Sequence, residues 1–263
     1  MDVLCVLPAR LDSRRIPHKS LQLLAGRPLI EWTWNAASRV AEIDRLLVAT
    51  DSEEIAGCVT GFGGEAILTA AEHRSGTDRV AEAARSVGAD EFDIVVNFQA
   101  DEPFADVSTV GRAVQVVATD RADIATLAAP IRSLEEWRSE GVVKVVIDRE
   151  GTALYFSRAP IPHPRGESPV FGEGETRYLR HVGIYVHRLE TLERWSSAPE
   201  SKLEATERLE QLRALEAGIG VHVEIGPSTE PGVDLPGDLE RAARHLERAT
   251  RYLELGVSRS TPK

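Results

Sequence analysis

The sequence predicts an α/β fold in which a mostly parallel sheet lies between two layers of helices. Apolar runs of strand length alternate with stretches of helical period along the first half of the chain. These runs are continuously apolar, which is typical of strands that are covered on both faces. With 263 residues, of which 42% are hydrophobic, the chain is long enough to bury a sizeable core.

Strands and helices are predicted to alternate regularly up to about residue 130. The expected strands lie at 2–9, 44–50, 65–70, 92–98 and 122–130. The expected helices lie at 29–40, 52–59, 77–87 and 107–118. Ser52 or Asp51 is the expected N-cap of the second helix, because short polar side chains satisfy the first free N–H groups.

After about residue 130 the pattern changes. Three strands, at 142–148, 153–158 and 180–187, follow without helices between them, which predicts antiparallel pairing or an inserted subdomain. The remaining elements are helices at 189–196, 204–216 and 236–254 and a strand at 220–226. We therefore expect a single domain at 1–248, with a β-rich elaboration at about 131–190, and a C-terminal tail at 249–263 that is disordered at its end.

Composition excludes several classes of function. A formal charge of −11 without a face-wide basic patch argues against nucleic-acid binding. No stretch approaches the roughly 20 apolar residues of a membrane span, and the N-terminus does not resemble a signal peptide. The two cysteines, Cys5 and Cys58, lack the spacing of a metal site. We expect a cytoplasmic protein with neither nucleic acid nor membrane as partner.

A basic segment follows the first predicted strand. The residues LPARLDSRRIPHKS at 7–20 include Arg10, Arg14, Arg15 and Lys19. Ligands of open α/β sheets bind at the carboxyl ends of strands, and several cations in one loop suit a polyphosphate. The alternative is a solvated loop whose arginines pair with surface carboxylates, but the position after the first strand favours phosphate binding.

Two groups of carboxylates are candidate metal ligands. Asp101 and Glu102 directly follow a buried strand and face the cationic loop, as Mg²⁺ ligands would, although adjacent acids before a proline also occur in ordinary turns. Asp234 lies just before the last predicted helix. On the residues alone, we favour capping of that helix by Asp234 or Asp238.

The segment HRSGTDRV at 73–80 places Ser75 at a junction of loop and helix, with Arg79 in the first turn. The N–H groups of a helix N-terminus can hold a ribose, a base or a phosphate, and simple capping is equally consistent. The segment GFGGEA at 61–66 precedes a strand, so it fails as a dinucleotide motif. His181 and His187 flank a strand, where structural histidines are more common than catalytic ones.

Seven segments occur together in order: PARLDSRRIPHKSL, HRSGTDR, NFQADEP, ALYFSRAPIP, RHVGIYVHR, LEQLRAL and GVDLPGDLER. Together they resemble the CMP-KDO synthetase family (3-deoxy-manno-octulosonate cytidylyltransferases; KDO is 3-deoxy-manno-octulosonate). The resemblance covers residues 2 to 248. It implies a three-layer, Rossmann-like nucleotide-binding fold of the nucleotide-diphospho-sugar transferase type, with a smaller β-rich element that helps to form a homodimer.

The resemblance also implies the activity. Enzymes of this family transfer CMP from CTP to a 2-keto sugar acid, release pyrophosphate and use Mg²⁺. The implied catalytic residues are Lys19, Arg10 and Asp101. The implied CTP contacts are Pro8, Ala9, Arg10, Ser13, Lys19, Ser75, Arg79 and Gln99. The implied acceptor contacts are Arg15, Gln99, Arg158, His181, Tyr185, Glu210 and Gln211. Asp101 and Asp234 become the implied Mg²⁺ ligands, which favours a metal role of Asp234 over a cap.

The sequence departs from the family pattern at some positions. Where the family usually has PGKPL this chain has PHKSL, so that His18 and Ser20 replace glycine and proline, and QADEP replaces QGDEP. Because glycine lets the backbone approach a ligand closely, these changes predict a reshaped pocket edge. Three interpretations remain: CMP transfer to KDO or a close relative, CMP transfer to another small acid such as a phosphonate (phosphonoformate, for example), and an inactive nucleotide-binding protein. The retained Lys19, Asp101 and Asp234 argue against the third.

Overall fold

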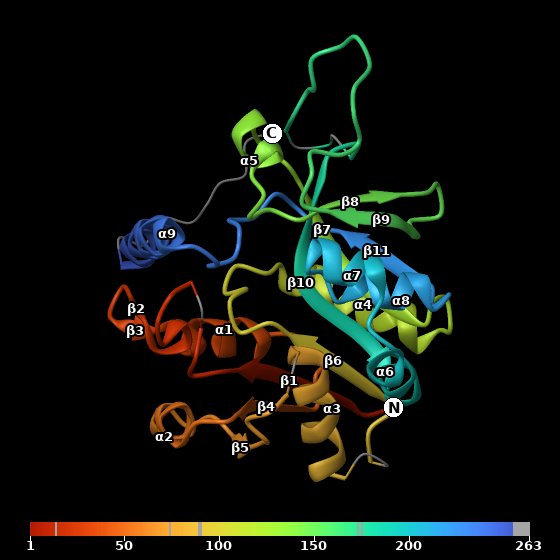
Figure 1. Ribbon diagram of the computed structural model, residues 1–263. Helices are drawn as coiled ribbons and strands as arrows, with labels where there is room; N and C mark the ends of the chain where they lie inside the picture. Colours follow the sequence, from red (N-terminus) through yellow and green to blue (C-terminus); the bar gives the residue numbers. More distant parts are fainter. Residues whose placement is uncertain (14, 74, 89–90, 173, 175, 255–263) are drawn as a thin grey trace.

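The computed structural model describes residues 1–254 except 14, 74, 89–90, 173 and 175. Its centre is a nine-stranded sheet whose main path runs β11-β7-β10-β6-β1-β4-β5 (Figure 1). The α/β fold class predicted from the sequence is confirmed. None of the helices in the described residues combines the length and the hydrophobicity that a membrane crossing requires.

The sheet is parallel except at one strand of its main path. Around β1 (Val3–Ala9), the strands β4 (Arg45–Thr50), β5 (Ala66–Leu68) and β6 (Ile94–Phe98) all pair in parallel. Strand β10 (Leu179–Arg188) lies antiparallel between β6 and β7 (Ile124–Pro130). Strand β11 (Val221–Ile225) is parallel to β7. The carboxyl ends of β1 and β6 therefore meet at one edge, where such sheets bind ligands.

Both faces of β1 are covered, which establishes the three layers. Val3, Cys5 and Leu7 pack into an apolar cluster with residues of α1 (Leu29–Ala37), α2 (Glu53–Gly61) and α4 (Val107–Ala118). Leu4 and Val6, which point to the opposite face, pack with α3 (Gly76–Ser86) and α6 (Leu189–Ser197). Alternate residues of a strand point to opposite faces, so a continuous apolar run is what a doubly covered strand needs.

The β-rich part belongs to the same sheet. Strand β8 (Lys144–Ile147) pairs antiparallel with β10 and with β9 (Ala153–Ser157), as the change of pattern after residue 130 predicted. The chain that follows β9 projects away from the body of the molecule (Figure 1). Between β7 and β8 lies the short helix α5 (Leu134–Arg138), which the sequence did not predict.

The helix predicted at 204–216 is wrong as a single element. It consists of α7 (Lys202–Glu207) and α8 (Gln211–Glu216), and Arg208 between them adopts a left-handed backbone with φ 55°. The last helix, α9 (Pro236–Glu254), is where it was predicted and includes the first six residues of the 249–263 segment; residues 255–263 lie outside the described residues. A 3₁₀ helix, η1 (Lys19–Leu21), and a hairpin of β2 (Leu23–Leu24) and β3 (Arg27–Pro28) were also missed.

Candidate active site

Two cavities adjoin at the carboxyl edge of the sheet. The smaller, of about 180 Å³, lies at the end of β1, and its wall includes six residues predicted to contact the nucleotide: Pro8, Ala9, Arg10, Ser13, Lys19 and Gln99. The larger, of about 690 Å³, lies between the end of β6, strand β10 and the segment before α9. Gln99 and Asp101 line both cavities. Ligands in the two cavities would therefore meet at these two side chains.

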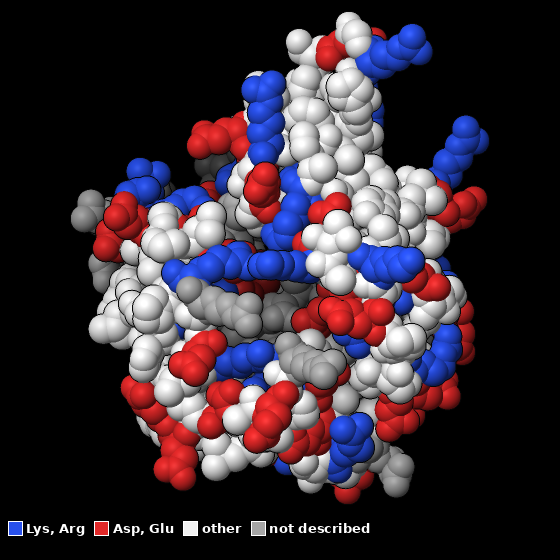
Figure 2. All heavy atoms as spheres, viewed as in Figure 1, with Lys and Arg blue, Asp and Glu red and all other residues white. Residues whose placement is uncertain are grey.

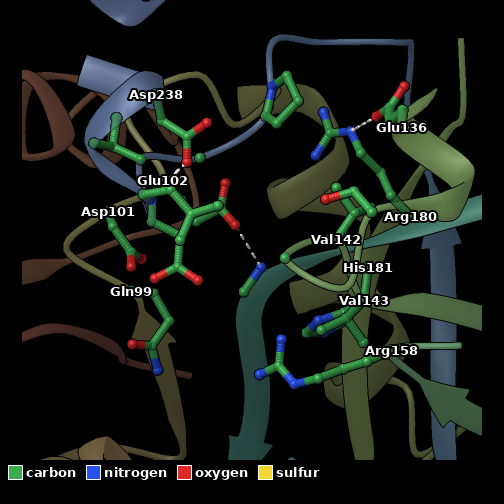
Figure 3. A pocket seen from close by; sticks show the side chains of 18 of the residues that line it. Gln99, Asp101, Glu102, Glu136, Val142, Val143, Arg158, Arg180, His181 and Asp238 are labelled. Atoms are coloured by element: carbon green, nitrogen blue, oxygen red, sulfur yellow. Dashed lines mark hydrogen bonds and ion pairs between the residues drawn. The ribbon is translucent and has the colours of Figure 1, made fainter. Parts of the chain in front are cut away.

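The larger cavity brings together every residue predicted to face the acceptor: Arg15, Gln99, Arg158, His181, Tyr185, Glu210 and Gln211. Figure 3 shows its two sides, with Gln99, Asp101, Glu102 and Asp238 opposite Arg158, Arg180 and His181. One side carries most of the labelled carboxylates and the other carries the guanidinium groups. On the molecular surface, Lys and Arg side chains border the central hollow of the face in Figure 2, although the chain is acidic overall.

Gln99 reaches the boundary between the cavities because two glycines leave room for it. A Cβ atom at Gly76, the first residue of α3, would lie 3.3 Å from Nε2 of Gln99. A Cβ atom at Gly183 in β10 would lie 3.0 Å from Cγ of Gln99. Both distances are tighter than ordinary contacts of Cβ atoms, so any larger residue at either position would displace the amide.

Lys19 joins three segments that are far apart in the sequence. Its ammonium group contacts the carboxylate of Asp101, lies 3.5 Å from Oδ1 of Asp234 and donates a hydrogen bond to the carbonyl of Val233 at 3.1 Å. Burial alone would lower the pKa of Lys19, but the carboxylates of Asp101 and Asp234 outweigh it and raise the pKa above its ordinary value. Lys19 is therefore a permanent cation at the boundary of the two cavities. Arg14, part of the same basic segment, lies outside the described residues.

The structure shows that Asp238, and not Asp234, caps the last helix. Asp238 accepts hydrogen bonds from the N–H groups of Asp234 and Leu235, at 2.9 and 2.7 Å, and so satisfies the start of α9. The carboxylate of Asp234 instead pairs with Arg15 and Lys19. Capping by Asp238 is confirmed, and Asp234 is left directed at the cations.

The two aspartates fit a magnesium ion that is held jointly with a substrate. Asp101 and Asp234 approach the same ammonium group, and their side chains are 27% and 36% exposed. Within the described residues, no group of three or more His, Cys, Asp or Glu side chains has the geometry of a metal site. Mg²⁺ commonly takes one or two carboxylates and completes its shell with waters and substrate phosphates, and these residues suit that mode.

Glu102, the other carboxylate that follows β6, has a different environment. It accepts a hydrogen bond from the N–H of Gly183 at 2.9 Å. Burial, and then the charge of Asp101, raise the pKa of Glu102 to about 7, while Arg180 opposes this shift. Gly232 packs so closely that a Cβ atom there would lie 3.0 Å from a Glu102 carboxylate oxygen. Glu102 thus connects β10 to the segment that carries Asp234.

Two predicted nucleotide contacts, Ser75 and Arg79, line neither cavity. Ser75 caps α3, because its hydroxyl accepts a hydrogen bond from the N–H of Asp78 at 3.1 Å. The side chain of Arg79 is fully buried and forms an ion pair with Asp51 at 2.9 Å. Asp51 in turn accepts a hydrogen bond from the N–H of Leu11. Through Asp51, Arg79 therefore helps to position Leu11 of the basic segment.

On the acceptor side, burial controls the ionisation of two groups. Burial lowers the pKa of His181 to about 3, with a further contribution from Arg180, so the ring is neutral near pH 7. Its Nε2 lies 2.9 Å from the hydroxyl of Thr126. Burial raises the pKa of Glu210, whose carboxylate accepts a hydrogen bond from the Thr77 hydroxyl at 2.7 Å. The ring of His181 therefore does not change its charge between pH 6 and 8.

The sequence did not identify several residues of the larger cavity. Arg180, which is buried, forms an ion pair with Glu136 of α5 at 3.3 Å and donates to the carbonyl of Thr229. Arg208 also lines this cavity. The sequence signal for Arg180 is its position beside His181 in RHVGIYVHR. Glu136 and Arg208 carry no such signal, since α5 and the break between α7 and α8 were not predicted.

The sequence and the fold of the chain are similar to those of known proteins. The sequence model of a family described as cytidylyltransferase matches residues 4–225. The chain is 46% identical to a 3-deoxy-manno-octulosonate cytidylyltransferase of Syntrophobacter fumaroxidans, over 91% of this chain and 95% of the relative. It is 42% identical to the protein of the same name from Syntrophotalea carbinolica, over 94% and 99%. A solved structure, CMP:2-keto-3-deoxy-manno-octonic acid synthetase complexed with CTP, has a TM-score of 0.85 at 39% identity and covers 95% of this chain and 100% of its own.

Proposed function

The chain belongs to the cytidylyltransferase family, and from that premise we propose that it transfers CMP from CTP to 3-deoxy-manno-octulosonate and releases pyrophosphate. The relatives named above carry this acceptor in their names, and the similar solved structure carries CTP. The alternative acceptor considered from the sequence, a phosphonate such as phosphonoformate, is not favoured by these relatives. CMP transfer requires that the nucleotide and the sugar acid bind next to each other.

One observation carries the proposal. Lys19 lies between Asp101 and Asp234 at the boundary of a small cavity, which is walled by the basic segment, and a larger cavity, which is walled by guanidinium groups. A triphosphate needs cations around it, and an acid acceptor needs at least one more. The two cavities provide both, and Gln99 and Asp101 are common to them.

The chemistry follows from this charge distribution. An acceptor hydroxyl oxygen forms a bond to the α-phosphorus of CTP, the bond from that phosphorus to pyrophosphate breaks, and the hydroxyl proton is released to solvent. Arg10 and Lys19 stabilise the negative charge that develops on the phosphate oxygens and on the leaving pyrophosphate. Gln99, held between Gly76 and Gly183, lies where the two substrates would touch. Binding of the acceptor in the larger cavity orients its hydroxyl for attack.

We further propose that Asp101 and Asp234 hold Mg²⁺. Both side chains offer carboxylate oxygens at the boundary of the cavities. They are far apart in the sequence, but both lie beside the ammonium group of Lys19. When bound, the ion would neutralise charge on the phosphates and orient their oxygen atoms.

We also propose a homodimer and a cytoplasmic location. Exposed apolar side chains on the β-rich part, Leu154 at 62% and Val170 at 62%, support a contact with a second copy. The requirement for CTP supports a cytoplasmic location. The two free cysteines, Cys5 and Cys58, also support it, because free thiols are typical of proteins in a reducing compartment.

Pyrophosphate release tests the function directly. The purified chain is supplied with CTP and Mg²⁺, and with either 3-deoxy-manno-octulosonate or phosphonoformate. Release that depends on the sugar acid supports the proposal. Release with the phosphonate alone would move the chain to the alternative acceptor, and no release with either would support an inactive nucleotide-binding protein.

A further inference from the structure

Arg208 holds an unusual backbone conformation on the wall of the larger cavity. It lies between α7 and α8 with φ 55° and ψ 51°, and it is exposed. For a residue with a Cβ atom other than Asn or Asp, the left-handed region is disfavoured, and such strain persists mainly where the surrounding structure enforces it. A glycine at position 208 would relieve this strain. We therefore expect the side chain of Arg208 to have a function that offsets the strain.

The surrounding structure fixes Arg208 beside Arg158. Its neighbour Glu207 accepts hydrogen bonds from the hydroxyl of Ser157 at 2.6 Å and from the N–H of Arg158 at 3.0 Å. The carbonyl of Glu207 accepts a further hydrogen bond from Nε of Arg158 at 3.0 Å. The end of α7 is thereby attached to the end of β9, and the two arginines are held as neighbours.

A buried lysine fixes Arg158 from the other side. Lys144 has no exposed surface, and its ammonium group donates to the carbonyls of Ser139 at 2.8 Å and Val142 at 2.6 Å and to that of Arg158. Ser139, Val142 and Arg158 all line the larger cavity. The backbone that carries Arg158 therefore has little freedom to move away from Arg208.

Two guanidinium groups of this cluster, those of Arg158 and Arg208, form no salt bridge with any residue that the structure describes. Arg15 pairs with Asp234, whereas Arg158 donates to two backbone carbonyls, of Glu207 and Glu140. In the part of the chain that the structure describes, the side chain of Arg208 forms neither a salt bridge nor a hydrogen bond. Burial, and then the positive charges of Arg15 and Arg208, lower the pKa of Arg158, while Asp234 and Glu207 oppose the shift. Neighbouring like charges of this kind favour the binding of an anion.

We propose that Arg208 is a specificity-determining residue which, together with Arg158, binds the carboxylate of the sugar-acid acceptor. The inference rests on the proposed function and adds a residue to it. A carboxylate accepts hydrogen bonds from planar guanidinium groups with good geometry, and two such groups can share its two oxygens. Arg208, with its left-handed backbone, lies in the wall of the same cavity as Arg158.

The test compares two glycine substitutions at left-handed residues that carry a Cβ atom, Arg208→Gly and Ala25→Gly. Ala25, in the turn between β2 and β3, has φ 47° and lines neither cavity. Both substitutions relieve backbone strain and are expected to raise the melting temperature. Only Arg208→Gly is expected to raise KM for the sugar acid, by about tenfold, because a hydrogen-bonded charge contact is lost. KM for CTP and kcat should stay within about twofold of the wild type.

A second ligand separates charge recognition from a general structural effect. The carboxamide of the same sugar acid lacks the negative charge, and its inhibition constant should be nearly the same in wild type and in Arg208→Gly. An unchanged KM for the sugar acid in Arg208→Gly, or an equal loss of affinity for the carboxamide, would overturn the inference. CMP transfer by the wild-type protein decides the proposed function independently, so the two failures can be told apart.

Discussion

Lys19 and Asp101, separated by 82 positions in the sequence, form an ion pair on the boundary between the two cavities. The pair connects the basic segment after β1 with the acidic turn after β6. Asp234, from the segment before α9, lies on the other side of the same ammonium group. A triphosphate with its metal and an acceptor would both reach this point, so its charges should control turnover more than they control folding.

We predict that Lys19→Ala lowers kcat by at least about a hundredfold, since removal of one group that stabilises charge in the transition state has an effect of this order. The fold should persist, because the packed core does not include Lys19. Pyrophosphate release and a thermal unfolding curve measure the two effects. Lys202→Ala, an exposed lysine at the start of α7, is the matched control and should behave as the wild type. Near-normal transfer by Lys19→Ala would remove this residue from the mechanism.

We predict that activity disappears on chelation of divalent cations and that Asp101→Asn nearly abolishes it.

Asp234→Asn should raise the Mg²⁺ concentration needed for half-maximal activity by about tenfold or more, since a neutral amide is a weaker ligand than a carboxylate. A magnesium titration of pyrophosphate release measures this. Asp238→Asn is the control, because Asp238 caps α9 through backbone N–H groups and an amide oxygen can also accept them. Equal magnesium requirements in wild type and Asp234→Asn would contradict the assignment.

The sheet and the positions of the basic segment and Asp101 could be predicted from the residues for a definable reason, whereas the acceptor-side residues of the candidate site were implied only by the family resemblance. Doubly covered strands give continuous apolar runs, and the ends of those runs located the basic segment and Asp101 at one edge. The role of Asp234 was ambiguous on the residues alone, because both capping and metal binding use a carboxylate at that position. In the structure Asp238 performs the capping, and the metal role of Asp234 stays a prediction.

Other features depended on packing that a sequence pattern does not record. Arg79 lies in the first turn of α3, in a segment that suggested ligand binding, yet its side chain is buried and pairs with Asp51. The helical pattern at 204–216 has no glycine to mark a break, and the left-handed residue between α7 and α8 is an arginine. The helix α5 has five residues and is too short for periodicity to reveal.

We predict that His18→Gly stabilises the protein. His18 has φ 51° and ψ 41°, a left-handed conformation at the position where the related motif PGKPL has glycine. The chain thus keeps the backbone turn while carrying a Cβ atom that the turn disfavours. Relief of this strain, less the greater entropy of an unfolded glycine, should raise the free energy of unfolding by about 1 kcal/mol, or the melting temperature by about 2–4 °C.

Calorimetry of the two proteins without ligands measures the effect of His18→Gly. Gly26→Ala is the converse control, since Gly26 has φ 81° and open space around it, so that substitution should destabilise through backbone strain alone. A lower melting temperature for His18→Gly would mean that the imidazole makes a stabilising contact which outweighs the strain.

The last prediction concerns pH and follows from Lys144. Burial, and then the charge of Arg158, lower the pKa of Lys144 to about 8 from an ordinary value of 10.5, while Glu207 and Glu140 oppose the shift. Below pH 8 the ammonium group has three hydrogens for the carbonyls of Ser139, Val142 and Arg158. Above pH 8 the neutral amine has two, so one buried carbonyl loses its donor.

As pH rises from 7 to 9, KM for the sugar acid should therefore increase, by about fivefold, because an unsatisfied buried carbonyl loosens the backbone that positions Arg158. The carboxylate of the acceptor stays ionised throughout this range, and KM for CTP should change little, since Lys144 contacts no part of the smaller cavity. Steady-state kinetics of wild type and Lys144→Met across this range provide the measurement. Lys144→Met should start with a raised KM for the sugar acid and show only the smaller rise that ionisation of Glu102, with its pKa of about 7, causes in both proteins. A parallel rise in both proteins would assign the pH dependence to a group other than Lys144.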